Sequence, residues 1–368
     1  MGRFVEGEEL ERLSSRHFAG DYVLSVYCPL RSREEYKEAI RRLEAFSVTL
    51  GNFEREAHEI IRYLIHYAPG EKVKGLAFFT SMLHDFFEVY ELPQAWKFTV
   101  VYGSSPYTRP LEAIFGEYPR IMLVLADRRE ARFFEIYMGE VREHEPLSSD
   151  VPSRVRSGGW YGLEERRIAR SIEQKVLQHL QDVVDALVEH FRKRHFEVFF
   201  VGLRDEEYVL FTRILPSYLQ GKFKGRVELD PKSDRIEILS SARRLEEMVR
   251  EEEDNALLDR LLTMVGNADL AVVGLPRVLR AALFGACQMV VVEEGYKEAG
   301  FLCRSCGTMT LLQGGCELCG GEQEEVDDVV GEILEIVVLQ RGEVKYVLPK
   351  NPKIFAAQHI GAFLRFQV

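Results

Sequence analysis

The distribution of hydrophobic and polar positions divides the chain into three regions. The first, 1–105, has a strand-like apolar run at Tyr22–Cys28 and a charged helical stretch from Arg33 to about Tyr67. After the turn signal Pro69-Gly70, a second strand-like run covers Gly75–Ser81. This order predicts an N-terminal α/β domain.

The second region, 106–240, is predicted to form a central domain. Two β-rich runs, 120–127 and 130–139, flank Arg128-Arg129 and predict a hairpin. A long helix is expected next, because apolar side chains recur there every three or four residues. They are Ile168, Ile172, Val176, Leu180, Val184, Leu187 and Phe191. Phe196–Gly202 then has the pattern of a buried strand.

The third region, 241–368, begins with a charged helix near Ala242. A strand–helix–strand pattern follows, with Pro276 at a position that a helix start tolerates. A helix from Val326 to Gln340 and two further strand-like segments complete the chain. We therefore expect a βαβ-type α/β sandwich interrupted by an insertion at about 301–322.

Composition narrows the class of protein. The 368 residues are 46% hydrophobic and 29% charged, which is typical of globular domains, and the net charge of −11 argues against a surface that coats DNA or RNA throughout. The first residues lack the apolar core of a signal peptide, and no apolar run approaches about 18 residues. We expect a cytoplasmic protein with neither membrane nor DNA as a partner.

Four of the six cysteines lie close together in the insertion. Cys303, Cys306, Cys316 and Cys319 form two C-x2-C pairs nine residues apart, and Gly307 and Gly320 follow the pairs. Glycine there allows backbone amides to turn towards sulfur. Four thiolates at this spacing suit one tetrahedral Zn²⁺ with no open position, which is a structural rather than a catalytic site. The alternative is four free thiols in a loop.

A basic glycine loop precedes the long helix of the second region. Gly158, Gly159 and Trp160 lie between Arg154 and Arg156 on one side and a basic helix start on the other. That helix start carries Arg166, Arg167, Arg170 and Lys175 against Glu164, Glu165 and Glu173. In an acidic protein, this local excess of positive charge suits RNA phosphates. The alternative is a plain glycine turn followed by solvated arginines.

The third region resembles the C-terminal domain of the archaeo-eukaryotic class-1 peptide release factors. The resemblance rests on Val272–Tyr296, the four-cysteine insertion, the acidic helix after it and the terminal Ile360–Phe366. The hairpin, the Gly-Gly loop and the Arg-rich helix of the second region are similar to the central domain of that family. Pelota and the bacterial release-factor-like proteins, including the hibernation factor Balon, are its relatives.

The resemblance implies a three-domain protein that binds the ribosomal A site, delivered by a translational GTPase such as elongation factor Tu. In release factors the loop carries Gly-Gly-Gln, and the glutamine serves hydrolysis of peptidyl-tRNA. Here Trp160 replaces that glutamine, and residues 1–105 contain no Asn-Ile-Lys-Ser stop-codon motif. We therefore expect a hibernation or rescue factor that occupies the site, with no catalytic residue of its own.

Two other classes of function stay open. One is an enzyme, a peptidyl-tRNA hydrolase or peptide release factor in which another group replaces the missing glutamine. The other is a zinc-stabilised scaffold that never contacts ribosomes. The sequence contains no H-E-x-x-H, G-x-S-x-G, P-loop or G-x-G-x-x-G motif that would indicate another enzyme class.

Overall fold

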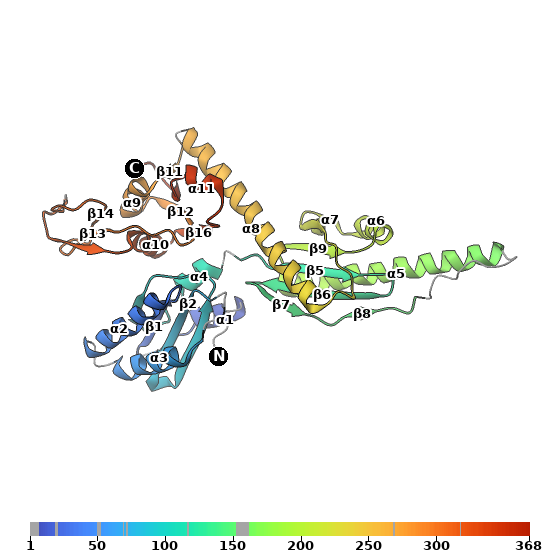
Figure 1. Cartoon of the computed structure of the whole chain (residues 1–368), viewed down its shortest axis with the longest axis horizontal. Coiled ribbons are helices and arrows are strands. Elements are labelled where there is room, and N and C mark those ends of the chain that lie inside the picture. The colour runs from blue at the N-terminus through green and yellow to red at the C-terminus, as the bar shows by residue number, and fades with distance from the viewer. Residues whose placement is uncertain are drawn as a thin grey trace. The chain divides into compact units, whose positions relative to one another are not determined.

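The computed structural model has two compact units, 1–117 together with 251–368, and 118–250. Figure 1 labels many of their helices and strands. The structure describes residues 7–18, 21–49, 53–68, 70, 73–115, 118–151, 162–267, 269–316 and 318–368. No helix among these residues is long and apolar enough to cross a membrane.

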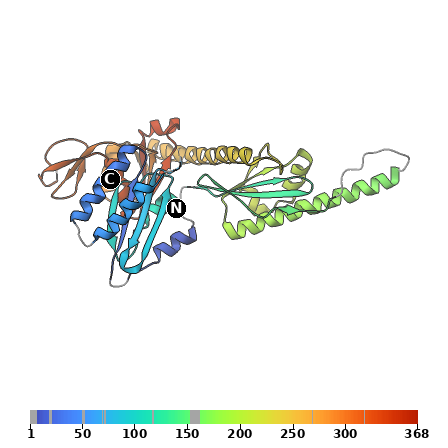
Figure 2. The same ribbon diagram turned by 60° about the horizontal axis from the view of Figure 1, so that its bottom comes forward.

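The N-terminal part of the first unit is an antiparallel sheet with the strand order β3-β2-β1-β4. Its strands are β1 (Val23–Pro29), β2 (Gly75–Ser81), β3 (Phe86–Leu92) and β4 (Thr99–Gly103). The helical elements are α1 (Gly7–Ser14), α2 (Arg33–Thr49), α3 (Glu54–His66), η2 (Met82–His84) and α4 (Arg109–Phe115). Apolar side chains of α2 and α3 pack with those of β1 and β2 in one core, so these two helices cover one face of the sheet (Figure 2).

The C-terminal part of the same unit is a mixed sheet with the order β11-β17-β12-β16. Its elements are β11 (Ala271–Val273), α9 (Leu275–Leu283), β12 (Cys287–Glu293), α10 (Val329–Leu339), β16 (Glu343–Val347), α11 (Pro352–Ala356) and β17 (Ile360–Leu364). Strands β12 and β16 are parallel, whereas β17 lies antiparallel between β11 and β12. The predicted βαβ unit is therefore present, within a sheet that also has antiparallel pairs.

Polar contacts join the two parts of this unit. Lys97 forms ion pairs with Glu332, at 2.9 Å, and with Glu335, both on α10. Arg109 of α4 donates a hydrogen bond of 2.9 Å to the Leu339 carbonyl oxygen at the end of the same helix. These contacts, between residues more than 200 positions apart, explain why the two ends of the chain form one compact unit.

The second unit contains a sheet with the order β10-β9-β5-β6-β7. Its elements are β5 (Ile121–Ala126), β6 (Glu130–Tyr137), β7 (Glu140–Glu143), β8 (Leu147–Ser148), α5 (Gly162–Arg194), β9 (Val198–Gly202), α6 (Asp205–Ile214), α7 (Ser217–Gln220), β10 (Phe223–Arg226) and α8 (Arg235–Gly266). The antiparallel β5–β6 pair confirms the predicted hairpin. Strand β9 is parallel to both β5 and β10.

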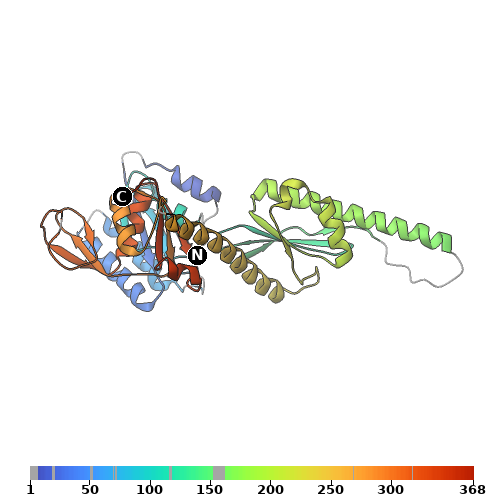
Figure 3. The same cartoon turned by 90° about the horizontal axis from the view of Figure 1, so that it is seen from above.

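Both faces of this sheet are covered by helices. Alternate residues along β5 point to opposite faces. Met122 and Val124 pack in one core with α5 and α6, and Leu123 and Leu125 pack in another with the first half of α8. In Figure 3, α5 runs along the sheet and its first turns continue beyond it. Helix α5 is thus anchored from about Ile172 onward, where the inward residues Ile172, Val176 and Leu180 are buried.

The structure refines several predicted elements. The helical stretch from Arg33 to Tyr67 is two helices, α2 and α3, and the predicted helix near Ala242 begins earlier, at Arg235. The mixed α/β class is confirmed, with four sheets among the described residues. The division into domains at 1–105, 106–240 and 241–368 stays a prediction.

Gly202→Ala should destabilise the second unit by about 1–3 kcal/mol, the usual range for overpacking a core. A Cβ atom at Gly202 would overlap the Leu229 carbonyl oxygen and lie 2.7 Å from Leu125 Cδ2. Gly221→Ala is the matched control, because a Cβ atom there meets nothing within 4 Å. Urea unfolding of both variants measures the difference, and equal midpoints would contradict the packing argument.

Candidate functional site

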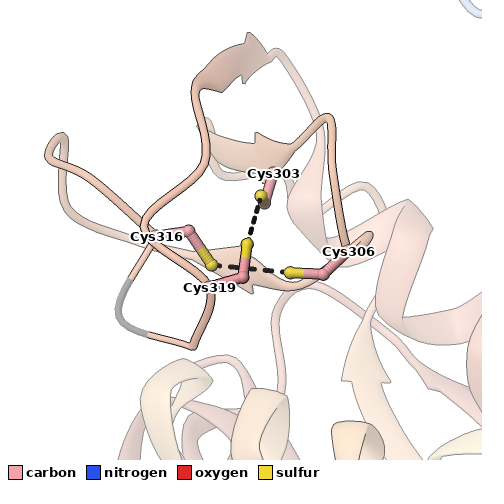
Figure 4. A group of neighbouring side chains, drawn as sticks. All are labelled: Cys303, Cys306, Cys316 and Cys319. Carbon is pink, nitrogen blue, oxygen red and sulfur yellow. Dashed lines mark hydrogen bonds between the residues drawn. The ribbon is translucent and has the colours of Figure 1, made fainter.

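The four clustered cysteines lie on a small sheet inserted between β12 and α10. This sheet has the order β14-β13-β15, with β13 (Gly300–Cys303), β14 (Met309–Thr310) and β15 (Gln323–Val326). The insertion predicted at 301–322 therefore extends slightly further in both directions. Figure 4 shows the four side chains converging from the two C-x2-C segments. Cys303 and Cys316 are buried, and Cys306 and Cys319 are exposed.

The two C-x2-C segments have the same backbone geometry. The Gly307 amide donates to the Cys303 carbonyl oxygen at 2.9 Å, and the Gly320 amide donates to the Cys316 carbonyl oxygen at 2.7 Å. Both glycines have positive φ angles, 72° and 69°, which glycine adopts without strain. The glycine after each pair thus allows the chain to turn around the sulfur atoms, as the sequence predicts.

The sulfur positions fit one zinc ion. All four Sγ atoms lie within 4.8 Å of one another. Two of the pairs, Cys303–Cys319 and Cys306–Cys316, are 3.5 Å apart. Tetrahedral Zn²⁺ with Zn–S bonds of about 2.3 Å requires sulfur separations of about 3.8 Å, so little movement would be needed. Four protein ligands would fill the coordination sphere, which leaves no position for a substrate.

Hydrogen bonds favour the thiolate form at two of the four cysteines, Cys303 and Cys306. The Thr308 hydroxyl and backbone lower the pKa of Cys306 to about 6. The backbone amides of Cys306 and Ser305 lower the pKa of Cys303, against a smaller raising effect of burial. The Gly321 amide lowers the pKa of Cys319, but the neighbouring Cys306 and Cys303 raise it above its ordinary value. Backbone amides are therefore aimed at sulfur, and the cluster is suited to hold zinc as a structural ion.

The predicted RNA-binding residues fall in two groups. Arg154, Arg156, Gly158, Gly159 and Trp160 lie outside the described residues. The other three belong to α5, where the backbone of Arg166 and Arg167 is helical and the side chain of Arg170 is exposed. Their role in RNA binding stays a prediction.

Two residues that the sequence did not single out meet beside this region. His179 of α5 is buried, and its Nδ1 atom lies 2.8 Å from the Ser149 Oγ atom, shortly before residue 152. One turn earlier on α5, Lys175 donates to the Asp150 carbonyl oxygen at 3.3 Å. The sequence offered one signal for this contact: His179 is a polar residue among the inward apolar positions of α5. Its neighbours on the helix, Val176, Leu180 and Val183, are all buried.

Acidification should destabilise the second unit, because burial lowers the pKa of His179 and His190 below the ordinary value of 6.5. The nearby His144 lowers the pKa of His190 further. The unfolded chain then binds protons that the folded chain does not, so the free energy of unfolding falls as pH drops through 6.5.

Urea unfolding between about pH 7.5 and about pH 5.5 measures this effect. His190→Gln removes one titrating group and should reduce the loss of stability. If the wild-type protein and His190→Gln lose the same amount of stability over this pH range, His190 does not contribute to the effect.

Comparisons with known proteins show what the chain is similar to. Residues 106–247 match the family described as bacterial archaeo-eukaryotic release factor family 10. The peptide chain release factor subunit 1 of Methanopyrus kandleri is 24% identical over 329 residues, covering 82% of this chain and 78% of that protein. Over these ranges the chain is similar to archaeo-eukaryotic release factors. The protein of the same name from Thermococcus sibiricus is 23% identical to it, covering 65% of this chain and 63% of that protein.

Some solved structures also show a distant similarity to this chain. The Pelota protein of Archaeoglobus fulgidus is 15% identical, covers 80% of each chain and has a TM-score of 0.38. A structure titled as a model of ribosome-bound archaeal Pelota and ABCE1 is 17% identical, with a TM-score of 0.43. It covers 100% of this chain and 96% of that chain.

Proposed function

We propose that this chain is a translation factor that binds the ribosomal A site and occupies it, in hibernation or rescue, without reading stop codons and without hydrolysing peptidyl-tRNA. One observation carries the proposal. The region that matches the release-factor family contains Gly158-Gly159-Trp160 where release factors carry Gly-Gly-Gln. The loop has kept the glycines and lost the side chain that serves hydrolysis.

The chemistry of the two side chains supports occupancy over hydrolysis. A glutamine amide offers both a donor and an acceptor at one end and can hold a water molecule in position. Tryptophan offers a single N–H donor and a large π face, which stacks on an unpaired base. Such stacking contributes about 1–3 kcal/mol per base. The basic start of α5 adds attraction to RNA phosphates, and Arg170 there is exposed.

The second candidate function is peptide release. It is favoured by the two relatives named peptide chain release factor subunit 1. Under this alternative, a group other than the glutamine would position water at the ester. Release of a labelled peptide from loaded ribosomes separates the two functions.

The proposal includes a partner and a location. A translational GTPase such as elongation factor Tu would deliver the protein to the A site, because the release-factor resemblance implies delivery of this kind. Ribosome binding places the protein in the cytoplasm. Pull-down of the GTPase in its GTP-bound and GDP-bound forms tests the partner directly.

Trp160→Ala should weaken binding to purified ribosomes by about 1–3 kcal/mol, the contribution of one stacked base. Co-sedimentation at moderate salt gives the dissociation constants. The second tryptophan, Trp96, is buried in the first unit, so Trp96→Phe is a control that should leave binding unchanged. No sedimentation of the wild-type protein would favour the scaffold function.

Neither the wild-type protein nor Trp160→Ala should release peptide from loaded ribosomes. Trp160→Gln restores the release-factor triplet and tests whether the loop backbone still follows the path needed for hydrolysis. Peptide release by the wild-type protein that is lost in Trp160→Ala would contradict the occupancy proposal.

A further inference from the structure

The segment just before residue 152 is attached to its domain at several points. Leu147 and Ser148 pair with β6, and the Ser149 amide donates to the Arg129 carbonyl oxygen at 2.8 Å. Val151 is buried in the core that also contains Ile172 and Val176 of α5. The chain therefore enters residues 152–161 from a segment, 147–151, that is held against the domain, and it continues after residue 161 as α5.

Two side chains of α5 reach back to this segment. Lys175 and His179 are one turn apart on the same face of the helix. Lys175 donates to the Asp150 carbonyl oxygen, and the Nδ1 atom of His179 lies 2.8 Å from the Ser149 Oγ atom. These contacts link the segment 147–151 to α5. The three side chains that make them, Ser149, Lys175 and His179, are called the clasp below.

His179 is an unusual choice for its position. It is 1% exposed, and burial holds its pKa below the ordinary value, so the ring is neutral at neutral pH. A buried polar ring is unfavourable unless it forms a hydrogen bond, and an aliphatic residue would pack there without that penalty. A hydrogen bond is directional, however, whereas the apolar contacts of Val151 with α5 would tolerate sliding of the segment along the helix.

We propose that His179 is a positioning residue, which through Ser149 holds the segment 147–151 in one position along α5. Both ends of the segment that carries Gly158, Gly159 and Trp160 are then fixed relative to each other. The expectation that the clasp affects ribosome binding rests on the proposed function. The role of the clasp in positioning the segment does not depend on that function. Lys175 supports the same position through the Asp150 backbone.

Ser149→Ala and His179→Gln test the proposal. Native-state trypsin cleavage after Arg154 and Arg156 measures how well the start of the segment is held. Each variant should increase the cleavage rate by about fivefold, the factor that corresponds to one buried hydrogen bond. Ser149→Thr keeps the hydroxyl group and should restore the wild-type rate. The double variant should be cleaved no faster than His179→Gln, because that variant already removes the contact with Ser149.

Two controls separate positioning from general loss of stability. Val184→Ala shortens a buried side chain of α5 outside the clasp, and Ser240→Ala removes an exposed hydroxyl that bonds only the Glu237 carbonyl oxygen within its own helix. If Val184→Ala accelerates cleavage as much as His179→Gln at equal loss of stability, the clasp has only a structural role and the proposal is wrong. The proposal is also wrong if Ser149→Ala is cleaved at the wild-type rate.

Ribosome binding by the same variants distinguishes the two proposals. If the wild-type protein binds, the clasp variants should bind about fivefold more weakly. If the wild-type protein does not bind, the proposed function fails, while the cleavage rates still decide whether the clasp positions the segment.

Discussion

Purified protein should contain one zinc ion per chain, and Cys303→Ser should abolish this metal content together with the fold of the inserted sheet. The insertion cannot form a core without the metal. Among its described residues, the buried side chains are Cys303, Met309 and Cys316, and two of these three are proposed zinc ligands. Leu312 and Leu318 are both more than two-thirds exposed. Structural zinc sites supply folding free energy of about 10–16 kcal/mol in small peptides, far more than one methionine.

Elemental analysis measures the metal, and amide hydrogen exchange of the peptides that cover β13–β15 measures the fold. Cys287→Ala is the matched control, because Cys287 lies in β12 outside the cluster and its replacement should leave zinc content unchanged. Exchange in α5 should not change in either variant. Protein without stoichiometric zinc that still protects β13 and β15 would contradict a structural metal site.

Replacing Arg166, Arg167 and Arg170 with glutamate should abolish ribosome binding. The change reverses three positive charges at the start of α5, where Arg170 is exposed. Each phosphate contact releases about one counterion on binding, so the loss of three contacts should make any residual binding less dependent on salt. The slope of log binding constant against log salt concentration should be smaller in magnitude by about 3. Co-sedimentation across a salt series measures both the affinity and the slope.

A second triple variant controls for net charge. Arg235, Arg243 and Arg244 are exposed on α8 of the same unit, and their replacement with glutamate changes the net charge by the same amount. This variant should retain most of the binding, because its arginines lie on another helix. Equal loss in the two variants would mean that total charge, and not the start of α5, governs binding.

The clustering of the four cysteines was the part of the candidate site that the sequence predicted best. Two C-x2-C pairs, each followed by glycine, are local features, and the hydrogen bonds from Gly307 to Cys303 and from Gly320 to Cys316 span only four residues. The inward face of α5 was equally predictable, because Ile172, Val176 and Leu180 follow the helical repeat and are buried as expected. One local signal was missed. Asp234 and Glu237 each accept the backbone N–H of the other, a capping box that begins α8 seven residues before the predicted start.

The sequence alone therefore determined what depends on neighbours along the chain: the mixed α/β class, the β5–β6 hairpin, the amphipathic helix α5 and the cluster of four cysteines. Only the tertiary structure decided what depends on residues far apart. It inserted β17 between β11 and β12, joined Lys97 to α10, and brought Ser149 to His179 across 30 positions. Helical repeats and metal-ligand spacings are local and leave a periodic pattern. Strand order and buried polar contacts depend on the packing of the whole domain. They leave no repeating pattern in the sequence from which they could be predicted.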